Sequence, residues 1–294
     1  MVKRNTAIGV VPDIHFATLH VASDQRVFEK YGLQPEFREF SGGTGELAEA
    51  LANGKVNIGI GLTDGFVTSI SKSADFRIIA TFVETPMKWI ILLPSNSSVG
   101  NIKDLNGKTF GITKFGGGSH INTILITSKQ GWIDNLDFNI KALGNLNSLV
   151  AALKTGAIDA CVWEPFSIKS LLNNKDLKAL ADEIIPPWPC FMVATRTDFL
   201  NNQEIITAIL AALQEAARIF HSDKVHSVEI VSKKYNLSKE DSEKWFESVR
   251  YSLDGMISQE ALENTLTTLM KVGAIKQRVD VSALISERFV SVRR

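Results

Sequence analysis

The chain has 294 residues, of which 45% are hydrophobic, and its 32 lysine and arginine residues balance its 32 aspartate and glutamate residues. This length is more than one small core requires and suits two lobes. A net charge of zero argues against a nucleic-acid partner, because neutralising phosphates requires a surplus of clustered basic residues.

The first apolar segment, residues 7–11, is typical of a strand rather than of an export signal. It is shorter than a signal-peptide core and is followed directly by Pro12 and Asp13. No later stretch reaches the roughly 18 apolar residues that a membrane span needs, so we expect no membrane insertion. We therefore expect a cytoplasmic protein, or a periplasmic or extracellular one if the sequence was trimmed to its mature form.

Two cysteines, Cys161 and Cys190, lie inside apolar runs. We interpret them as buried free thiols, because no partner at a suitable spacing indicates a disulfide or a metal site. No metal is expected.

An internal repeat organises the first two thirds of the chain. Residues 47–60 can be laid on residues 149–162, and the same offset carries residues 8–10 onto residues 110–112. Each copy has a strand, a loop of small residues, a helix, a second strand, another such loop, a helix that ends at glycine, and a third strand. This alternation predicts a parallel sheet with right-handed crossovers in each copy, and hence two lobes with a cleft between them.

The chain changes character after the second copy. The prolines at 186, 187 and 189 exclude a helix there, and residues 190–195 are typical of a returning strand. From Asn201 the pattern is helical, with Ser238 and Ser258 as predicted N-caps. We expect these helices to pack on the first lobe. The predicted lobes are residues 1–92 with 189–294, and residues 93–188, and the predicted crossings lie near residues 87–94 and 186–189.

Several short sequence motifs together resemble those of a known family. They are Gly32-Leu33, residues 51–59, residues 102–111 and Trp163-Glu164-Pro165. The likeness extends from residue 6 to about residue 290. The sequence resembles the type 2 periplasmic solute-binding proteins, within the group of aliphatic-sulfonate and thiamine-pyrimidine binders that also includes the fungal thiamine pyrimidine synthase. The resemblance implies an α/β fold with two lobes, a central cleft and a two-segment hinge. Its pocket is expected at the carboxyl ends of the strands, as in open α/β sheets generally.

Candidate ligand-binding residues lie in loops that follow predicted strands. In the first lobe they are Asp13, His15, Phe16, Ser41, Gly42, Thr44, Thr63 and Asp64. In the second lobe and hinge they are Phe115, Gly116, Gly117, Ser119, His120, Asn145, Trp163, Glu164 and Trp188. The glycine-rich loop before Ser119 is the strongest signal, because its backbone could approach a ligand closely. Each candidate also has a structural explanation, as a helix cap, a flexible loop or a core residue.

These observations favour binding of a small polar or heteroaromatic molecule, thiamine-pyrimidine-like or sulfonate-like, without a cofactor. The carboxylates of Asp13, Asp64 and Glu164 favour a neutral or partly cationic ring, whereas the glycine-rich loop favours an anion. Whether a transporter is a partner stays open.

An enzyme of thiamine pyrimidine biosynthesis is the alternative that the resemblance brings. In the fungal synthase a lysine holds pyridoxal phosphate and a histidine four residues later supplies ring atoms. Those positions fall on Gly61 and Gly65, and neither glycine can form a Schiff base or donate an imidazole. The cysteine cluster of that enzyme is reduced here to Cys190. A third hypothesis is a scaffold whose cleft serves as a surface for protein interaction or for sensing.

Overall fold

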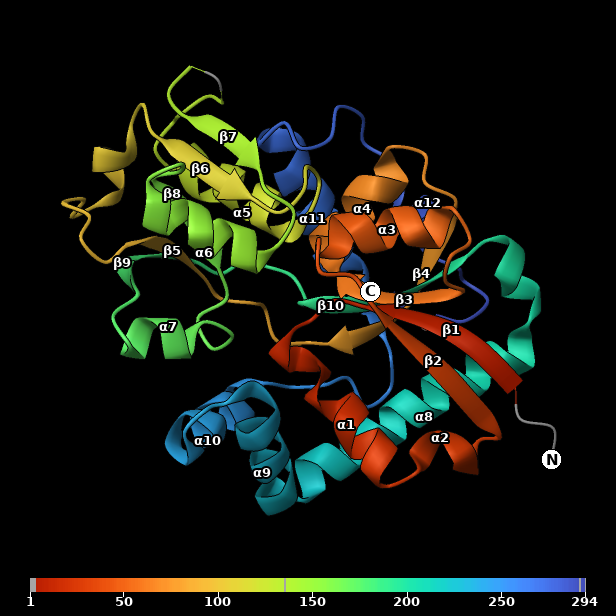
Figure 1. Cartoon of the computed structure of the whole chain (residues 1–294). Helices are drawn as coiled ribbons and strands as arrows, with labels where there is room; N and C mark the ends of the chain where they lie inside the picture. Colours follow the sequence, from red (N-terminus) through yellow and green to blue (C-terminus); the bar gives the residue numbers. More distant parts are fainter. Residues whose placement is uncertain (1–3, 135, 291, 294) are drawn as a thin grey trace.

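The computed structural model describes residues 4–134, 136–290 and 292–293, and in this part of the chain two five-stranded sheets form the framework (Figure 1). The first sheet contains, in spatial order, β2 (Leu33–Glu39), β1 (Arg4–Val10), β3 (Ile58–Leu62), β10 (Phe191–Arg196) and β4 (Phe76–Val83). The second contains, in the same order of equivalent strands, β7 (Asn139–Ala142), β6 (Thr109–Ile112), β8 (Ala160–Trp163), β5 (Trp89–Pro94) and β9 (Leu177–Ile184). The matching orders confirm the repeat that the sequence predicts.

Both sheets are mixed, whereas the alternation of strands and helices predicts wholly parallel ones. β1 pairs parallel with β2 and β3, and β6 pairs parallel with β7 and β8. β10 runs antiparallel between β3 and β4, and β5 runs antiparallel between β8 and β9. β5 and β10 are the strands that directly follow a crossing between the sheets, so each enters its new sheet in the reverse direction.

The crossings lie between β4 and β5 and between β9 and β10, in the two regions that the sequence indicates. β5 begins at Trp89 and pairs only within the second sheet, so this sheet comprises strands from Trp89 to Ile184. The division into lobes at residues 92–93 and 188–189 stays a prediction.

Helices cover the faces of both sheets. Those of the first lobe are η1 (Ile14–Phe16), α1 (Ala17–Asp24), α2 (Val27–Lys30), α3 (Thr44–Ala52) and α4 (Thr63–Ser71). Those of the second lobe are η2 (Ile102–Leu105), α5 (Gly118–Ser128), α6 (Leu146–Thr155) and α7 (Lys169–Asn173). The C-terminal segments are η3 (Asp198–Asn201), α8 (Gln203–Ser222), α9 (Lys224–Tyr235), α10 (Lys239–Ser248), α11 (Gln259–Lys271), α12 (Val281–Leu284) and the short pair β11 (Ile257–Ser258) and β12 (Val292–Arg293).

The C-terminal helices pack on the first lobe, as the sequence predicts. α8 lies along α1 and α2, and α11 and α12 lie against α4 (Figure 1). The Oγ atoms of Ser238 and Ser258 accept hydrogen bonds from the backbone N–H groups three residues later, which confirms both predicted N-caps.

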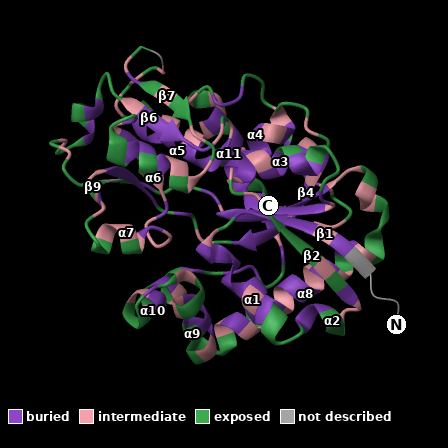
Figure 2. Cartoon of the chain, viewed as in Figure 1, coloured by how far each residue is buried: buried purple, intermediate pink, exposed green. Residues whose placement is uncertain are grey.

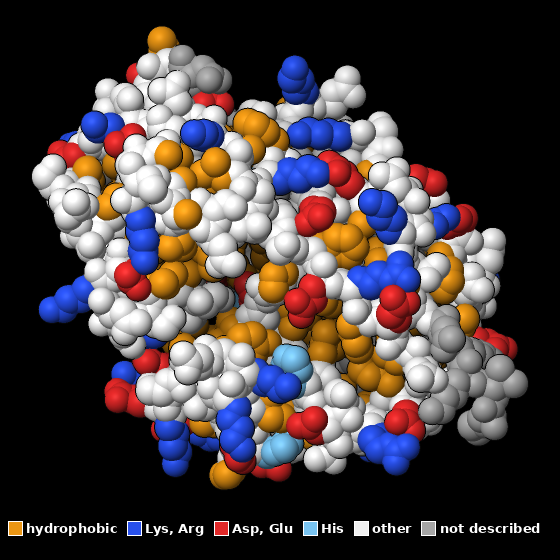
Figure 3. Space-filling view, viewed as in Figure 1, with side chains coloured by type: hydrophobic (Ala, Val, Ile, Leu, Met, Phe, Trp, Pro, Cys, Tyr) orange, Lys and Arg blue, Asp and Glu red, His pale blue; other side chains and the backbone are white. Residues whose placement is uncertain are grey.

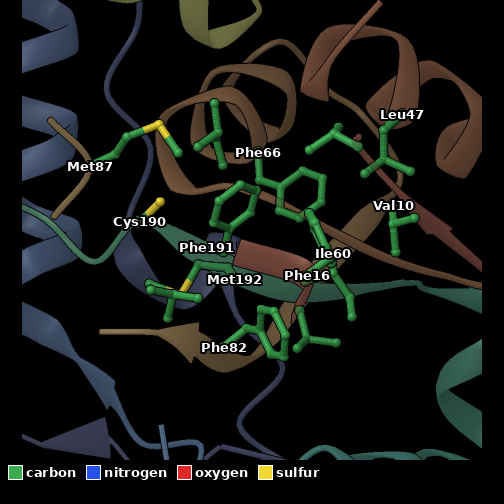
Figure 4. Packing of buried hydrophobic residues seen from close by; sticks show 14 of the residues in the cluster. Val10, Phe16, Leu47, Ile60, Phe66, Phe82, Met87, Cys190, Phe191 and Met192 are labelled. Carbon is green, nitrogen blue, oxygen red and sulfur yellow. The ribbon is translucent and has the colours of Figure 1, made fainter. Parts of the chain in front are cut away.

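The centres of both sheets are buried, and exposed residues gather on the outer faces of the helices (Figure 2). Every residue of β3 is buried, as expected for a strand covered on both faces. Phe16, Phe66 and Phe191 pack together with Ile60 and Met192 in the core of the first lobe (Figure 4).

The repeated glycines have the role that the alignment predicts. Gly54 and Gly156 follow α3 and α6 with φ values of 73° and 72°, a left-handed conformation that disfavours any side chain. Cys161 and Cys190 are buried and free. Over the described ranges, no helix combines the length and apolar character needed to cross a bilayer.

Candidate functional site

A cleft of about 750 Å³ opens between the two lobes, and the space-filling view shows the surface hollowed near its centre (Figure 3). Its walls come from the loops after β1, β2 and β8, from the start of α6 and from the end of α9. An inner chamber of about 50 Å³ lies deeper between the lobes. The cleft and the chamber share five lining residues, Val11, Pro12, Asp13, Ser41 and Trp163. The chamber is therefore the inner end of the cleft.

The turn after β1 places a carboxylate at the junction of cleft and chamber. Asp13 caps η1, and its Oδ1 accepts hydrogen bonds from the backbone N–H of His15 at 2.9 Å and from Nδ1 of His15 at 2.6 Å. Two tyrosines of the C-terminal region hold this turn, because Tyr235 donates to the carbonyl of Asp13 and Tyr251 to that of His15. The position of the Asp13 carboxylate is thus fixed from two sides.

A second carboxylate faces the chamber from the other lobe. Glu164 follows β8 and is 4% exposed. Its two oxygens accept hydrogen bonds from the backbone N–H groups of Phe166 and Ser167, at 2.9 and 2.7 Å. Burial raises the pKa of Glu164, and the nearby Asp13 carboxylate raises it further, while His15 and the two N–H groups oppose that shift.

His15 lies between these charges. Burial alone would lower the pKa of its imidazole, but the charge and hydrogen bond of Asp13, with the charge of Glu164, outweigh burial and raise that pKa. The ring also contacts Phe191 and Trp245, with centroids 5.5 and 5.7 Å apart. Asp13, His15 and Glu164 therefore form one coupled group of titratable side chains across the two lobes.

The first residues of two helices line the same chamber. Thr44 begins α3, and its Oγ1 accepts from the backbone N–H of Leu62 at 3.0 Å. Gly118 and Ser119 begin α5, and Oγ of Ser119 accepts from the backbone N–H of Thr113 at 3.0 Å. The N-terminal ends of two helices, which carry partial positive charge, thus border the chamber that the two carboxyl groups also line.

The sequence candidates divide into two sets by their position. Those that line the cleft or chamber are Asp13, Phe16, Ser41, Thr44, Ser119, Asn145, Trp163 and Glu164. Those that lie outside both linings are His15, Gly42, Thr63, Asp64, Phe115, Gly116, Gly117, His120 and Trp188. The roles of both sets in ligand binding stay predictions.

Several candidates of the second set have structural contacts of their own. The Thr63 hydroxyl donates to the carbonyl of Pro189 and so joins α4 to the second crossing. Phe115 is 58% exposed, and its ring packs edge-on against His120. Burial, with a smaller effect of Lys72, lowers the pKa of His120 to about 4, so this imidazole is neutral at physiological pH. Trp188 is buried in the core.

The family comparison covers most of this framework. Residues 13–224 match the model of the family described as NMT1/THI5 like. The chain belongs to this family. The resemblance inferred from the sequence motifs is thereby confirmed.

Individual relatives support the same fold for this NMT1/THI5-like protein. It is 26% identical over 204 residues to an Escherichia coli (strain K12) protein named as an aliphatic sulfonates-binding protein, an alignment that spans 68% of this chain and about three fifths (61%) of that protein. A Candida albicans gene product described as having the generic periplasmic binding protein fold superposes with a TM-score of 0.89 at 23% identity, over 99% of both chains. The alkanesulfonate-binding protein SsuA of Xanthomonas axonopodis pv. citri, bound to MOPS, gives a TM-score of 0.80 at 17% identity, over 97% of this chain and 99% of that one. At these identities the structural likeness establishes the fold alone.

The pyridoxal phosphate site of the fungal synthase does not fit this NMT1/THI5-like chain. A Cβ at Gly61 would lie 2.7 Å from Cζ of Phe66 and 2.9 Å from Cγ2 of Thr44, and a Cβ at Gly65 would lie 2.7 Å from the same Thr44 atom. Thr44 and Phe66 thus occupy the space that side chains at these positions would need. Lysine is also absent from the described residues that line the chamber.

Some residues that line the cleft or the chamber are not among the candidates predicted from the sequence. Leu62, Met87, Trp89, Thr113 and Phe191 line the chamber, and His20, Glu39, Lys234 and Tyr235 line the outer cleft. The predicted crossing near residues 87–94 could have nominated Trp89, because a hinge segment borders the cleft. Tyr235 reaches the cleft from a distant helix, and no local pattern marks it.

Proposed function

We propose that this protein binds a small, neutral or cationic heteroaromatic molecule with hydrogen-bond donors, such as an aminopyrimidine, in the cleft between its lobes. One observation carries the proposal. The chamber is lined by the carboxylates of Asp13 and Glu164 and by the rings of Trp89, Trp163 and Phe191, and lysine and arginine are absent from its described lining. Carboxylates accept hydrogen bonds from amino groups, and aromatic rings stack on flat heterocycles.

The two volumes indicate how such a ligand would lie. Small-molecule sites usually measure about 300–1,000 Å³, a range that includes the cleft and excludes the chamber. The ring would therefore lie in the cleft beside Trp163, with its amino-bearing edge in the chamber against Asp13 and Glu164. The inner end of this position is bordered by both lobes, so we expect a bound ligand to favour their closure.

A sulfonate is the less favoured ligand, although relatives named for sulfonate binding share the fold. The N-termini of α3 and α5 favour an anion. A sulfonate, however, has no donor for the carboxyl oxygens of Asp13 and Glu164, whereas an amino group has, so the acceptors of the chamber favour the aminopyrimidine.

A thermal-shift screen with aminopyrimidines and alkanesulfonates, run in parallel, tests the proposal. A ligand at a hundred times its Kd adds about 2.7 kcal/mol of stability, which corresponds to several degrees in Tm for a chain of this size. We expect such a shift with at least one aminopyrimidine and none with the sulfonates.

Glu164→Gln should weaken the aminopyrimidine response, because a hydrogen bond to a charged group contributes about 1.5–3 kcal/mol, or roughly a ten- to hundredfold change in Kd. Glu260→Gln, the same change at an exposed residue of α11, is the control. Each variant is compared with its own ligand-free Tm. A sulfonate response that is indifferent to Glu164→Gln would overturn the proposal.

A further inference from the structure

Gly116 and Gly117, in the loop before α5, lie against the opposite lobe and outside the linings of the cleft and the chamber. A Cβ at Gly45 in α3 would lie 3.4 Å from the backbone nitrogen of Gly117. A Cβ at Gly65 in α4 would lie 3.8 Å from the carbonyl oxygen of Gly116, and one at Gly118 would lie 2.2 Å from Cδ1 of Leu62. These glycines allow the backbones of the two lobes to approach each other directly.

A buried hydrogen bond crosses the same contact. Asp64, in the first turn of α4, is 2% exposed, and Asn122, in α5, is 0% exposed. Nδ2 of Asn122 donates to Oδ2 of Asp64 at 3.2 Å and to the carbonyl of Gly118 at 2.9 Å. Oδ1 of Asp64 accepts from the backbone N–H of Gly65 at 2.7 Å. α4 packs on the first sheet and α5 on the second, so the Asp64–Asn122 bond joins the lobes.

We propose that the Asp64–Asn122 hydrogen bond is a latch that holds the lobes closed and thereby regulates ligand retention. Only the consequence for retention rests on the proposed ligand-binding function. The latch itself is a property of the ligand-free chain, and Asp64 acts in it as a positioning residue outside the lining of the cleft.

Two ion pairs that join the lobes in the described part of the chain are weaker. Lys114 pairs with Glu49 and Lys169 pairs with Asp241, but the lysine side chains of both pairs are more than a third exposed. Exposed ion pairs contribute little, because solvent screens them and ordering long side chains costs entropy. Breaking the Asp64–Asn122 bond while the lobes stay closed would leave buried polar groups unpaired, which is a larger penalty.

The latch is also reversible. Oδ1 of Asn122 is buried without a hydrogen-bond partner in the described part of the chain. In an open molecule water would reach this oxygen. Removing that water on closure costs free energy, which offsets part of what the hydrogen bond contributes to the closed state. A balance of this kind leaves the closed state sensitive to a single added interaction, such as one with a ligand.

Small-angle X-ray scattering of the ligand-free protein tests the latch directly. Asn122→Asp places a second carboxyl group against Asp64, so at about pH 8 the closed state must either hold two like charges together or keep one group protonated, and both cost free energy. We expect the radius of gyration of this variant to exceed that of the wild type, which should be near the roughly 19 Å of a compact chain of this length. Asn53→Asp, at an exposed residue after α3, should leave scattering unchanged.

The double variant Asp64→Asn with Asn122→Asp exchanges acceptor and donor across the contact and should return scattering toward the wild-type curve. This rescue distinguishes a latch from general damage to the fold, and circular dichroism of each variant confirms folding. Unchanged scattering in folded Asn122→Asp, or a double variant that is as open as the single one, overturns the latch. Failure of every ligand to bind would overturn the proposed function and leave this scattering result intact.

Discussion

The turns that follow β1 and β6 occupy equivalent places in the two lobes, yet they carry opposite kinds of residue. After β1 the turn presents Asp13 and His15, which are hydrogen-bonded to each other, and Asp13 lines the chamber. After β6 the turn presents glycines, and only its two ends line the chamber, Thr113 at its start and Gly118 with Ser119 at its end. The first turn thus supplies chemical groups to the cleft, whereas the second brings the opposite lobe within contact.

The difference shows that a glycine-rich loop next to a helix N-terminus is ambiguous in a two-lobed fold. Such a loop allows close approach of a backbone, but the approaching group can be the other lobe as well as a ligand. The structure favours the lobe for Gly117 and leaves the carboxylate turn as the stronger candidate for ligand contact.

The largest expected effect is on the pH dependence of stability. It comes from Asp64, the buried carboxylate of the latch, and not from the carboxylates that line the cleft. Burial raises the pKa of Asp64 to about 6 from 3.8, because the hydrogen bonds from Gly65 and Asn122 offset only part of the desolvation. The folded pKa exceeds the unfolded one, so this contribution to stability is complete below about pH 4 and is lost as the pH rises through 6. The shift corresponds to about 3 kcal/mol.

Asp64→Asn removes that titration. Urea unfolding at several pH values should show the free energy of unfolding of the variant, relative to wild type, rising between pH 4 and pH 6.5. The Cys190 thiol responds to Asp64, because burial and the charges of Asp13, Asp64 and Glu164 raise its pKa. That pKa lies well above 9.0, outside the pH range of this experiment, so the difference reports on Asp64. A difference that is flat with pH would contradict the assignment.

A smaller loss of stability should follow from adding a side chain to the glycine-rich turn. In Gly118→Ala the new Cβ would meet Cδ1 of Leu62 at 2.2 Å and Cη2 of Trp89 at 3.0 Å. Overpacking usually costs about 1–3 kcal/mol, and the better helix propensity of alanine returns up to about 1 kcal/mol. We therefore expect a net loss of about 1–2 kcal/mol in urea unfolding.

Gly100→Ala is the matched control for this substitution. Its Cβ would lie 3.7 Å from Oδ2 of Asp104, which is an ordinary contact. We expect its stability to equal or slightly exceed that of the wild type. Equal stability of Gly118→Ala and Gly100→Ala would show that the lobes do not pack as closely as the structure has them.

The scaffold could be predicted from the sequence because its signals are local or periodic. The helix-ending glycines at 54 and 156, the serine caps and the proline-rich crossing each act on their own neighbourhood, and the repeat places the strands in order. Asp13, Trp163 and Glu164 reach the cleft because they follow strands, and strand ends converge in an α/β fold.

The partners of these residues could not be predicted in the same way. Asp64 is an acidic residue at a helix start, a pattern typical of an ordinary N-cap, and no spacing links it to Asn122 in the other lobe. Tyr235 contacts the Asp13 turn from more than two hundred residues away. Such contacts depend on how the lobes and the C-terminal helices dock, and docking is decided by packing over the whole molecule.

The smallest expected change in the free energy of unfolding comes from an ion pair at the rim of the contact between the lobes. Lys114 lies in the same glycine-rich turn and pairs with Glu49, with side chains 37% and 61% exposed. Lys114→Ala should lower the free energy of unfolding by less than about 1 kcal/mol. Raising the salt from about 0.1 M to about 1 M shortens the Debye length from about 10 Å to about 3 Å, so this small difference should shrink further in urea unfolding. Lys103→Ala, at an exposed residue of η2, provides the baseline. If Lys114→Ala instead opened the ligand-free molecule as far as Asn122→Asp does, closure would reside in the charged rim, and the buried contact between the lobes would be its consequence rather than its cause.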